Sequence, residues 1–114
     1  MENCLFCGII SGKVKGAIVH QDETVVAFKD VNPKAPVHIL IVPRKHIATL
    51  LDLEPGDEGV IEDVFRVAAD VAEQVGIAKS GFRLVVNCGA DAGQTVFHLH
   101  YHLLGGRRLG WPPG

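Results

Sequence analysis

Residues 53–76 are the one stretch of this chain with the apolar spacing of a long helix. Apolar residues recur there every three or four positions, which places them on a single helix face. These positions are Val60, Val64, Val67, Val71 and Val75. Asp57 and Glu58 suit the positive N-terminal end of a helix, and Gly76 suits its C-terminal cap. We therefore predict one long helix whose apolar stripe packs in the core.

The other regular elements are predicted to be short strands joined mostly by hairpins. Five runs carry the apolar and β-branched residues typical of strands. They are residues 17–21, 25–30, 37–43, 81–89 and 96–104. Because few helical crossovers separate these runs, the pattern favours an α+β fold with a mainly antiparallel five-stranded sheet and the long helix on one face.

A short helix is predicted at the N-terminus, before the first strand. Leu5, Ile9 and Ile10 fit one face of it, and Gly12 is a natural terminator. At 114 residues the chain is expected to be a single domain, residues 1–114.

Composition narrows the class of partner. The net charge is −2 with histidines neutral, so no broad basic face for nucleic acid is expected. No stretch approaches the roughly 18 apolar residues of a membrane span, and no signal peptide is apparent. The three cysteines do not suggest a disulfide framework. These features predict a cytoplasmic protein that binds neither membrane nor nucleic acid.

Three of the six histidines lie at alternating positions near the C-terminus. His98, His100 and His102 would share one face of a strand, because side chains alternate along it. Leu99 and Tyr101 would face the other way. Imidazole is a metal ligand, a nucleophile and a proton carrier near neutral pH. Two interpretations remain open at this point: a zinc site on the strand, or a nucleophilic histidine positioned by the other two.

The loop before these histidines is rich in small polar donors. Asn87, Gly93, Gln94 and Thr95 lie within a few residues of them. Such a loop suits an anionic oxygen, with phosphate the obvious candidate, although an ordinary turn has the same composition.

The stretch His98-Leu99-His100-Tyr101-His102-Leu103-Leu104 resembles the His-x-His-x-His motif of the histidine triad (HIT) family, in which each x is hydrophobic. The resemblance covers nearly the whole chain in colinear order. It includes FKDVNPKAPVHILIVPRKHI (28–47), GFRLVVNCGADAGQTVFHLHYHLLGGR (81–107) and the closing WPPG. These segments look like the Hint branch, the purine nucleoside phosphoramidases.

The resemblance implies a covalent reaction at phosphorus that requires no cofactor. His100 matches the nucleophile, which would attack the α-phosphorus of a purine nucleoside phosphoramidate, release an amine and form a nucleotidyl-histidine. Water would then release the nucleoside monophosphate. His102 matches the residue that contacts the phosphate oxygens and helps the leaving group. His98 and His38 match supporting histidines that orient the site.

The resemblance also implies a nucleotide site and a homodimer. Asp30 matches the acid that holds the ribose hydroxyls. The phosphate contacts would come from Asn87, Gly93, Gln94 and Thr95. The purine slot would be formed by Phe6, Ile9, Phe28 and Val31. Trp111 matches a tail residue that reaches the partner subunit's site, and the GFRLVVN strands would pair into one continuous sheet across the dimer.

Cys4-x-x-Cys7 is a separate, weaker metal signal. One such pair cannot close a tetrahedral site by itself. Some bacterial triad proteins resembling this one bind a structural zinc through such a pair and two histidines, and the matching positions here are His46 and His98. The alternative is two reduced cysteines without a metal.

Two further functional hypotheses remain beside the phosphoramidase. The chain would be a nucleotide-binding interaction module if hydrolysis were only incidental to binding. It would be a metalloenzyme if the triad itself held zinc, and a chelator would then abolish its activity.

Overall fold

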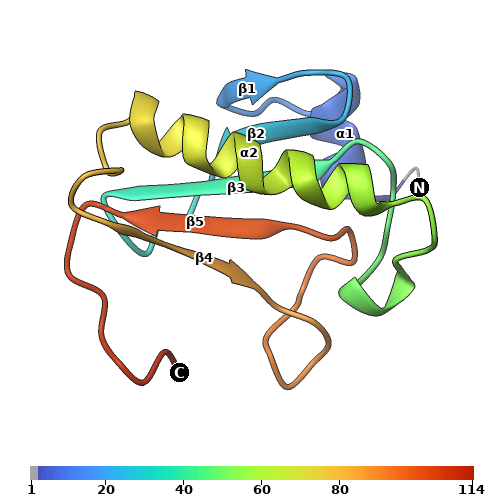
Figure 1. Cartoon of the computed structure of the whole chain (residues 1–114). Coiled ribbons are helices and arrows are strands. Elements are labelled where there is room, and N and C mark those ends of the chain that lie inside the picture. Colours follow the sequence, from blue (N-terminus) through green and yellow to red (C-terminus); the bar gives the residue numbers. More distant parts are fainter. Residues whose placement is uncertain (1–2) are drawn as a thin grey trace.

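The computed structural model describes residues 3–114 and consists of one five-stranded sheet with a helix on each face (Figure 1). The elements are α1 (Leu5–Ser11), β1 (Ile18–Gln21), β2 (Val25–Lys29), β3 (Val37–Pro43), the 3-10 helix η1 (Leu50–Asp52), α2 (Glu58–Gln74), β4 (Phe82–Val86) and β5 (Tyr101–Gly105). The strand order is β1-β2-β3-β5-β4, and every neighbouring pair is antiparallel. The predicted α+β fold is confirmed. Within residues 3–114, no helix combines the length and apolarity needed to cross a membrane.

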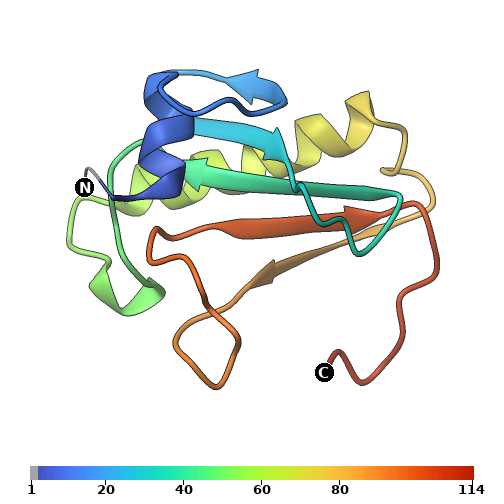
Figure 2. The same cartoon turned by 180° about the vertical axis from the view of Figure 1, so that it is seen from behind.

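The sheet separates two apolar clusters. α2 crosses one face of the sheet (Figure 1), and α1 lies against the opposite face near β2 (Figure 2). The predicted stripe of α2 is confirmed, since Val64, Val67 and Val71 are buried against the sheet. The smaller cluster contains Phe6 and Ile9 of α1 packed on β2 and β3. The face opposite α2 is therefore only partly covered, which leaves room for a site.

The long helix begins later than its sequence pattern suggests. The predicted span of 53–76 is wrong at its N-terminal end, because α2 spans Glu58–Gln74. Pro55 disfavours helical backbone at the residue before it, and Gly56 adopts a φ of 101°. Asp57 stands at the N-cap, where its carboxylate pairs with Lys45 at 2.8 Å. Gly76 follows the helix with a φ of 79°, as predicted for a C-terminal cap.

Two strands are shorter than predicted. β5 begins at Tyr101 rather than residue 96, and β4 covers Phe82–Val86 rather than 81–89. The β3–β5 ladder ends at the pair Ile41 and Tyr101. β3 stops at Pro43, which has no N–H for a further rung. Beyond the ladder, Leu99 is held by one backbone bond to the carbonyl of Ile47.

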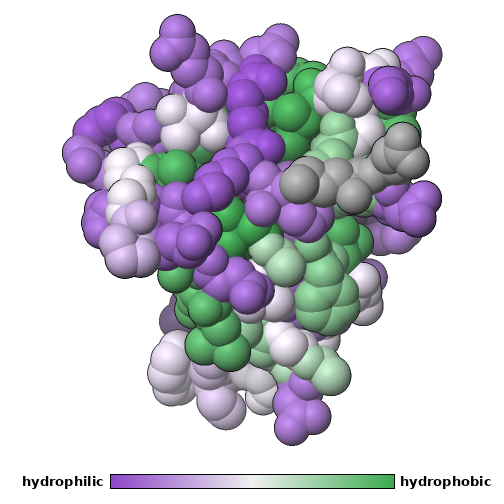
Figure 3. Space-filling model, turned by 90° about the vertical axis from the view of Figure 1, so that its right-hand side faces the viewer, coloured by the Kyte–Doolittle hydropathy of each residue, from purple (hydrophilic) through white to green (hydrophobic). Residues whose placement is uncertain are grey.

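The N-terminal helix is present, but its predicted face is partly wrong. Phe6 and Ile9 are buried, whereas Leu5 is 50% exposed. Gly12 ends the helix with a φ of 84°. Figure 3 looks onto the end of the molecule that carries α1, where apolar residues reach the surface between hydrophilic ones.

Candidate active site

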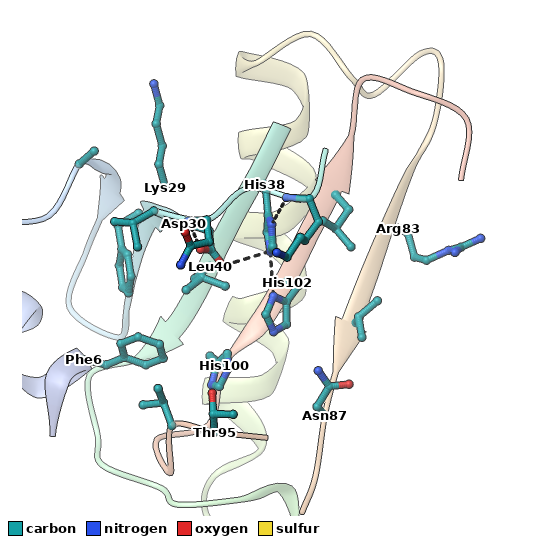
Figure 4. A pocket seen from close by; sticks show the side chains of 18 of the residues that line it. Phe6, Lys29, Asp30, His38, Leu40, Arg83, Asn87, Thr95, His100 and His102 are labelled. Atoms are coloured by element: carbon teal, nitrogen blue, oxygen red, sulfur yellow. Dashed lines mark hydrogen bonds and ion pairs between the residues drawn. The ribbon is translucent and has the colours of Figure 1, made fainter. Parts of the chain in front are cut away.

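A cleft of about 1020 Å³ lies on the face of the sheet opposite α2. Two rows of side chains cross its floor in strand register. The first row is Phe28, Leu40, His102 and Val85. The second is Asp30, His38, Leu104 and Arg83, with the N–H of Asp30 bonded to the carbonyl of His38. The order of the strands therefore sets an apolar end near β2, histidines in the middle and an arginine at β4 (Figure 4).

The three alternating histidines share the cleft side of their segment. Leu99, Tyr101 and Leu103 are buried in the cluster beneath α2. His100 and His102 line the cleft. The alternation holds although only His102 belongs to a regular strand, since Leu99 packs in the same cluster as Tyr101 and Leu103. His98 is buried but is not among the residues that line the cleft.

Backbone contacts fix the proton positions on His100. Its Nδ1 lies 2.7 Å from the carbonyl oxygen of His98, and a carbonyl only accepts hydrogen bonds. Nδ1 therefore carries the proton, and in the neutral ring Nε2 has a free lone pair. His100 is only 8% exposed, and the ring of Phe6 packs edge-on against it at 5.0 Å. The structure thus presents one oriented, unprotonated nitrogen at the cleft.

A second chain of contacts sets the protons on His38 and His102. The backbone N–H of Lys34 donates to Nδ1 of His38 at 3.0 Å, so the proton of His38 is on Nε2. That Nε2 donates to Nδ1 of His102 at 2.9 Å and lies 3.3 Å from a carboxylate oxygen of Asp30. Neutral His102 must then carry its proton on Nε2, where it can be donated toward a bound group.

Burial keeps these rings neutral. Burial, followed by the nearby His100 and His38, lowers the pKa of His102 to about 4. Burial also lowers the pKa of His38, although the carboxylate of Asp30 acts in the opposite direction. At neutral pH both rings are uncharged, so the chain of tautomers is intact.

The apolar end of the cleft is formed by α1 and β2. Phe6 and Phe28 meet edge to face with centroids 5.3 Å apart. Ile9 also lines this end, as expected for the purine slot. Val31 lines it too, but its side chain is 91% exposed, so it forms the rim rather than a buried wall.

The predicted phosphate-binding loop is only partly directed at the cleft. Asn87 and Thr95 line the same cleft as His100 (Figure 4). Gln94 does not line it: its amide accepts from the N–H of Gly89 and donates to two backbone carbonyls. Gly93, with a φ of 87°, donates its N–H to Ala90 inside the turn. In this structure, Gln94 and Gly93 serve the loop rather than the cleft, because their polar groups are already paired.

Trp111 also lies outside the cleft of this chain. It is 82% exposed and stacks near the guanidinium of Arg83, 5.9 Å from the ring centroid. The neighbouring Pro112 and Pro113 line the cleft in its place.

Cys4, Cys7, His46 and His98 converge in a second cluster beside the histidine segment. Their ligand atoms all lie within 4.8 Å of one another. Nε2 of His98 is 2.7 Å from the carbonyl of Pro43, so its proton is there and Nδ1 is free to face the two sulfurs. The structure therefore brings together all four residues expected for a metal site.

Three backbone groups that orient the histidines are not predictable from the sequence. They are the N–H of Lys34 and the carbonyls of Pro43 and His98. No pattern of side chains reports which backbone group an imidazole will meet, so only the fold reveals them.

A family model described as "HIT domain" matches residues 11–109. The chain is 46% identical to the purine nucleoside phosphoramidase of Escherichia coli K12 over 96% of this chain and 92% of that protein. The chain belongs to the HIT family. An uncharacterized HIT-like protein of Synechocystis is 48% identical over 99% of this chain and 98% of its own length.

Solved structures of HIT proteins share the fold along its whole length. A HIT family hydrolase from Legionella pneumophila has a TM-score of 0.96 and 44% identity, covering 98% of this chain and all of its own. A HIT family hydrolase from Clostridium thermocellum has a TM-score of 0.94 and 51% identity, covering 96% of each chain. The similarity to these relatives shows that this HIT protein is a hydrolase.

Proposed function

We propose that this HIT hydrolase cleaves the P–N bond of purine nucleoside phosphoramidates through a nucleotidyl-histidine intermediate. The observation that carries the proposal is the free lone pair on Nε2 of His100, oriented by the bond from Nδ1 to the carbonyl of His98. A neutral, fixed imidazole is a good nucleophile near pH 7. The similarity to the E. coli purine nucleoside phosphoramidase supports the same chemistry.

The cleft suits a nucleotide laid across the strands. The purine would pack against the apolar end of the cleft that Phe6, Ile9 and Phe28 line, and the carboxylate of Asp30 would accept from the ribose hydroxyls. The phosphate would then lie over His100, within reach of Asn87 and Thr95. This order follows the rows of the sheet from β2 toward β4.

The two chemical steps use the tautomers of His100 and His102 that the hydrogen bonds of the fold select. Nε2 of His100 attacks phosphorus while the P–N bond breaks, and the departing nitrogen takes a proton from water while the Nε2–H of His102 donates a hydrogen bond to the phosphate. A water molecule then attacks phosphorus, breaks its bond to Nε2 of His100, gives up a proton to the solvent and becomes part of the nucleoside monophosphate. Splitting the displacement into two steps lowers each barrier.

The test uses a fluorogenic adenosine phosphoramidate with His100→Ala and, as a matched control, the surface variant His20→Ala. We expect His100→Ala to lose at least about a thousandfold in kcat/KM while binding adenosine monophosphate within a few-fold of wild type. The control should change neither. Undiminished turnover by His100→Ala would refute the nucleophile. If wild type binds the nucleotide but hydrolyses no phosphoramidate, the interaction-module hypothesis is favoured.

We also propose that Cys4, Cys7, His46 and His98 bind a structural zinc. The three sulfur–nitrogen distances between these residues are 3.4, 3.3 and 3.5 Å. Tetrahedral zinc with bonds of about 2.3 Å to sulfur and about 2.0 Å to nitrogen separates the two atoms by about 3.5 Å. The carbonyl of Pro43 holds His98 in the tautomer that a metal needs. A zinc there would tie α1 to the segment that carries His100.

Metal analysis of protein purified without chelator tests this site. We expect about one zinc per chain in wild type and in the control Cys88→Ser, and a large loss in Cys7→Ser. Less than half an equivalent in wild type would contradict the proposal. Removal of zinc should lower the unfolding temperature, because a metal that binds only the folded chain stabilises it.

We propose a homodimer in which β4 pairs with its copy. β4 is an edge strand that pairs only with β5 among the described residues, and its side chains are mostly apolar. Such an edge favours pairing with another strand. Light scattering should give twice the chain mass of 12.3 kDa, and a monomer at micromolar concentration would contradict the proposal.

A further inference from the structure

The cleft concentrates positive charge in a chain that is negative overall. The net charge is −2, with 11 lysines and arginines against 13 acidic residues. Five of those cations line the cleft: Lys15, Lys29, Lys34, Arg83 and Arg107. Asp30 is the single acidic residue among the described lining residues. The cleft therefore holds more positive charge than is needed to balance the single negative charge of a phosphoramidate linkage.

The cations fall into two groups along the cleft. Lys29 ends β2, and Lys15 precedes Gly16, which lies against Ile9 at the apolar end. The other three come from β4, from the β2–β3 loop and from the segment after β5. Arg83 occupies β4, at the opposite end of the row that begins with Asp30 (Figure 4). Lys34 and Arg107 are joined to one another, and Arg107 follows the end of β5.

Lys34 and Arg107 are held together beside the histidines. Nε and Nη2 of Arg107 donate to the carbonyl of Lys34 at 3.2 and 2.8 Å. The N–H of Lys34 donates to His38, whose pKa the charge of Lys34 helps to lower. These bonds join the guanidinium of Arg107 to the backbone of Lys34 and so keep the two residues side by side at the edge of the cleft. Within residues 3–114, neither has a carboxylate within 4.0 Å.

The proposed phosphate position does not use these three cations. There, His102, Asn87 and Thr95 supply the donors, and the nucleoside extends toward Phe6. The departing amine would therefore lie toward β4. Leu109 and Pro112 also line the cleft and add apolar surface to it. A leaving group with a short carbon chain and an anionic end would meet both the apolar and the charged parts of this wall.

We propose that the substrate's leaving amine carries its own anionic group, a carboxylate or a phosphate, bound by Lys34, Arg83 and Arg107. This rests on the proposed phosphoramidase function and names the class of its substrate. Lys34 is the clearest specificity residue, because within residues 3–114 its hydrogen bonds use only its backbone and the residue is exposed.

Three adenosine phosphoramidates test the proposal, made with β-alanine, β-alaninamide and 2-aminoethylphosphonate. The first two differ in charge but hardly in shape, and the third replaces carboxylate by phosphonate. We expect wild type to favour β-alanine over β-alaninamide by about fivefold in kcat/KM at low salt, falling toward equality at 1 M salt. A further gain with the phosphonate would identify phosphate as the preferred anion, and a loss would identify carboxylate.

Lys34→Gln should lower the β-alanine preference by about threefold, and Lys34→Glu should reverse it. Lys15→Gln is the matched control, since it removes the same charge from the other end of the cleft and should leave the preference unchanged. Equal effects of Lys15→Gln and Lys34→Gln, or no preference in wild type, would overturn this inference while phosphoramidase activity stands. If none of the three compounds is hydrolysed, the proposed function fails as well.

Discussion

The depressed pKa of His102 makes the stability of the fold depend on pH. In the unfolded chain the pKa of this imidazole is near its ordinary value of 6.5. In the folded protein, burial and the neighbouring His100 and His38 lower this pKa to about 4. Between these values the unfolded state binds more protons, so acid favours unfolding. The stability that neutral His102 preserves is complete above pH 6.5 and is lost progressively down to pH 4.

The size of the effect follows from the two pKa values. For a single group with pKa values of 6.5 and about 4, linkage predicts a loss of about 2 kcal/mol between pH 7 and pH 5. Partial exposure of His102 and its coupling to His38 reduce this, so we expect about 1–2 kcal/mol.

Urea unfolding of wild type and His102→Gln at pH 7 and pH 5 measures the effect. Both proteins retain the other titrating groups, so the difference between them isolates His102. The wild type should lose about 1–2 kcal/mol more than His102→Gln on acidification, and His20→Gln, at a surface pair with Asp22, should follow wild type. An equal loss in wild type and His102→Gln would refute the argument that burial holds this ring neutral.

Three further predictions concern single side chains. Phe6→Ala should raise the KM of an adenosine phosphoramidate about tenfold with a smaller change in kcat, because Phe6 packs on Phe28 and on His100; steady-state kinetics tests this. Leu99→Ala should cost about 2–5 kcal/mol in urea unfolding, because Leu99 is completely buried. Gly105→Ala should cost about 1–3 kcal/mol, since its Cβ would lie 2.7 Å from the side chain of Ile77; an unchanged midpoint would contradict this close approach.

Local periodicity determined much of the fold. Alternating residues of the last strand placed His98, His100 and His102 on one side because the side-chain period of an extended chain is two. Helical spacing identified the buried valines of α2, and short apolar and β-branched runs identified the paired strands β1 and β2. These predictions succeeded because each depends on residues that are near one another in sequence.

Tertiary structure decided the features that join distant segments. The bond between His38 and His102 links residues 64 positions apart, and the contact between Cys4 and His98 links residues 94 apart. The polarity of Gln94 predicts a contact with phosphate. In the structure, its side-chain amide is instead hydrogen-bonded to backbone groups of the loop and to the carbonyl of Ala48. The type of a residue determines which hydrogen bonds its side chain is able to make. Which of them it makes, and on which imidazole nitrogen the proton lies, depends on the backbone groups that folding brings beside it.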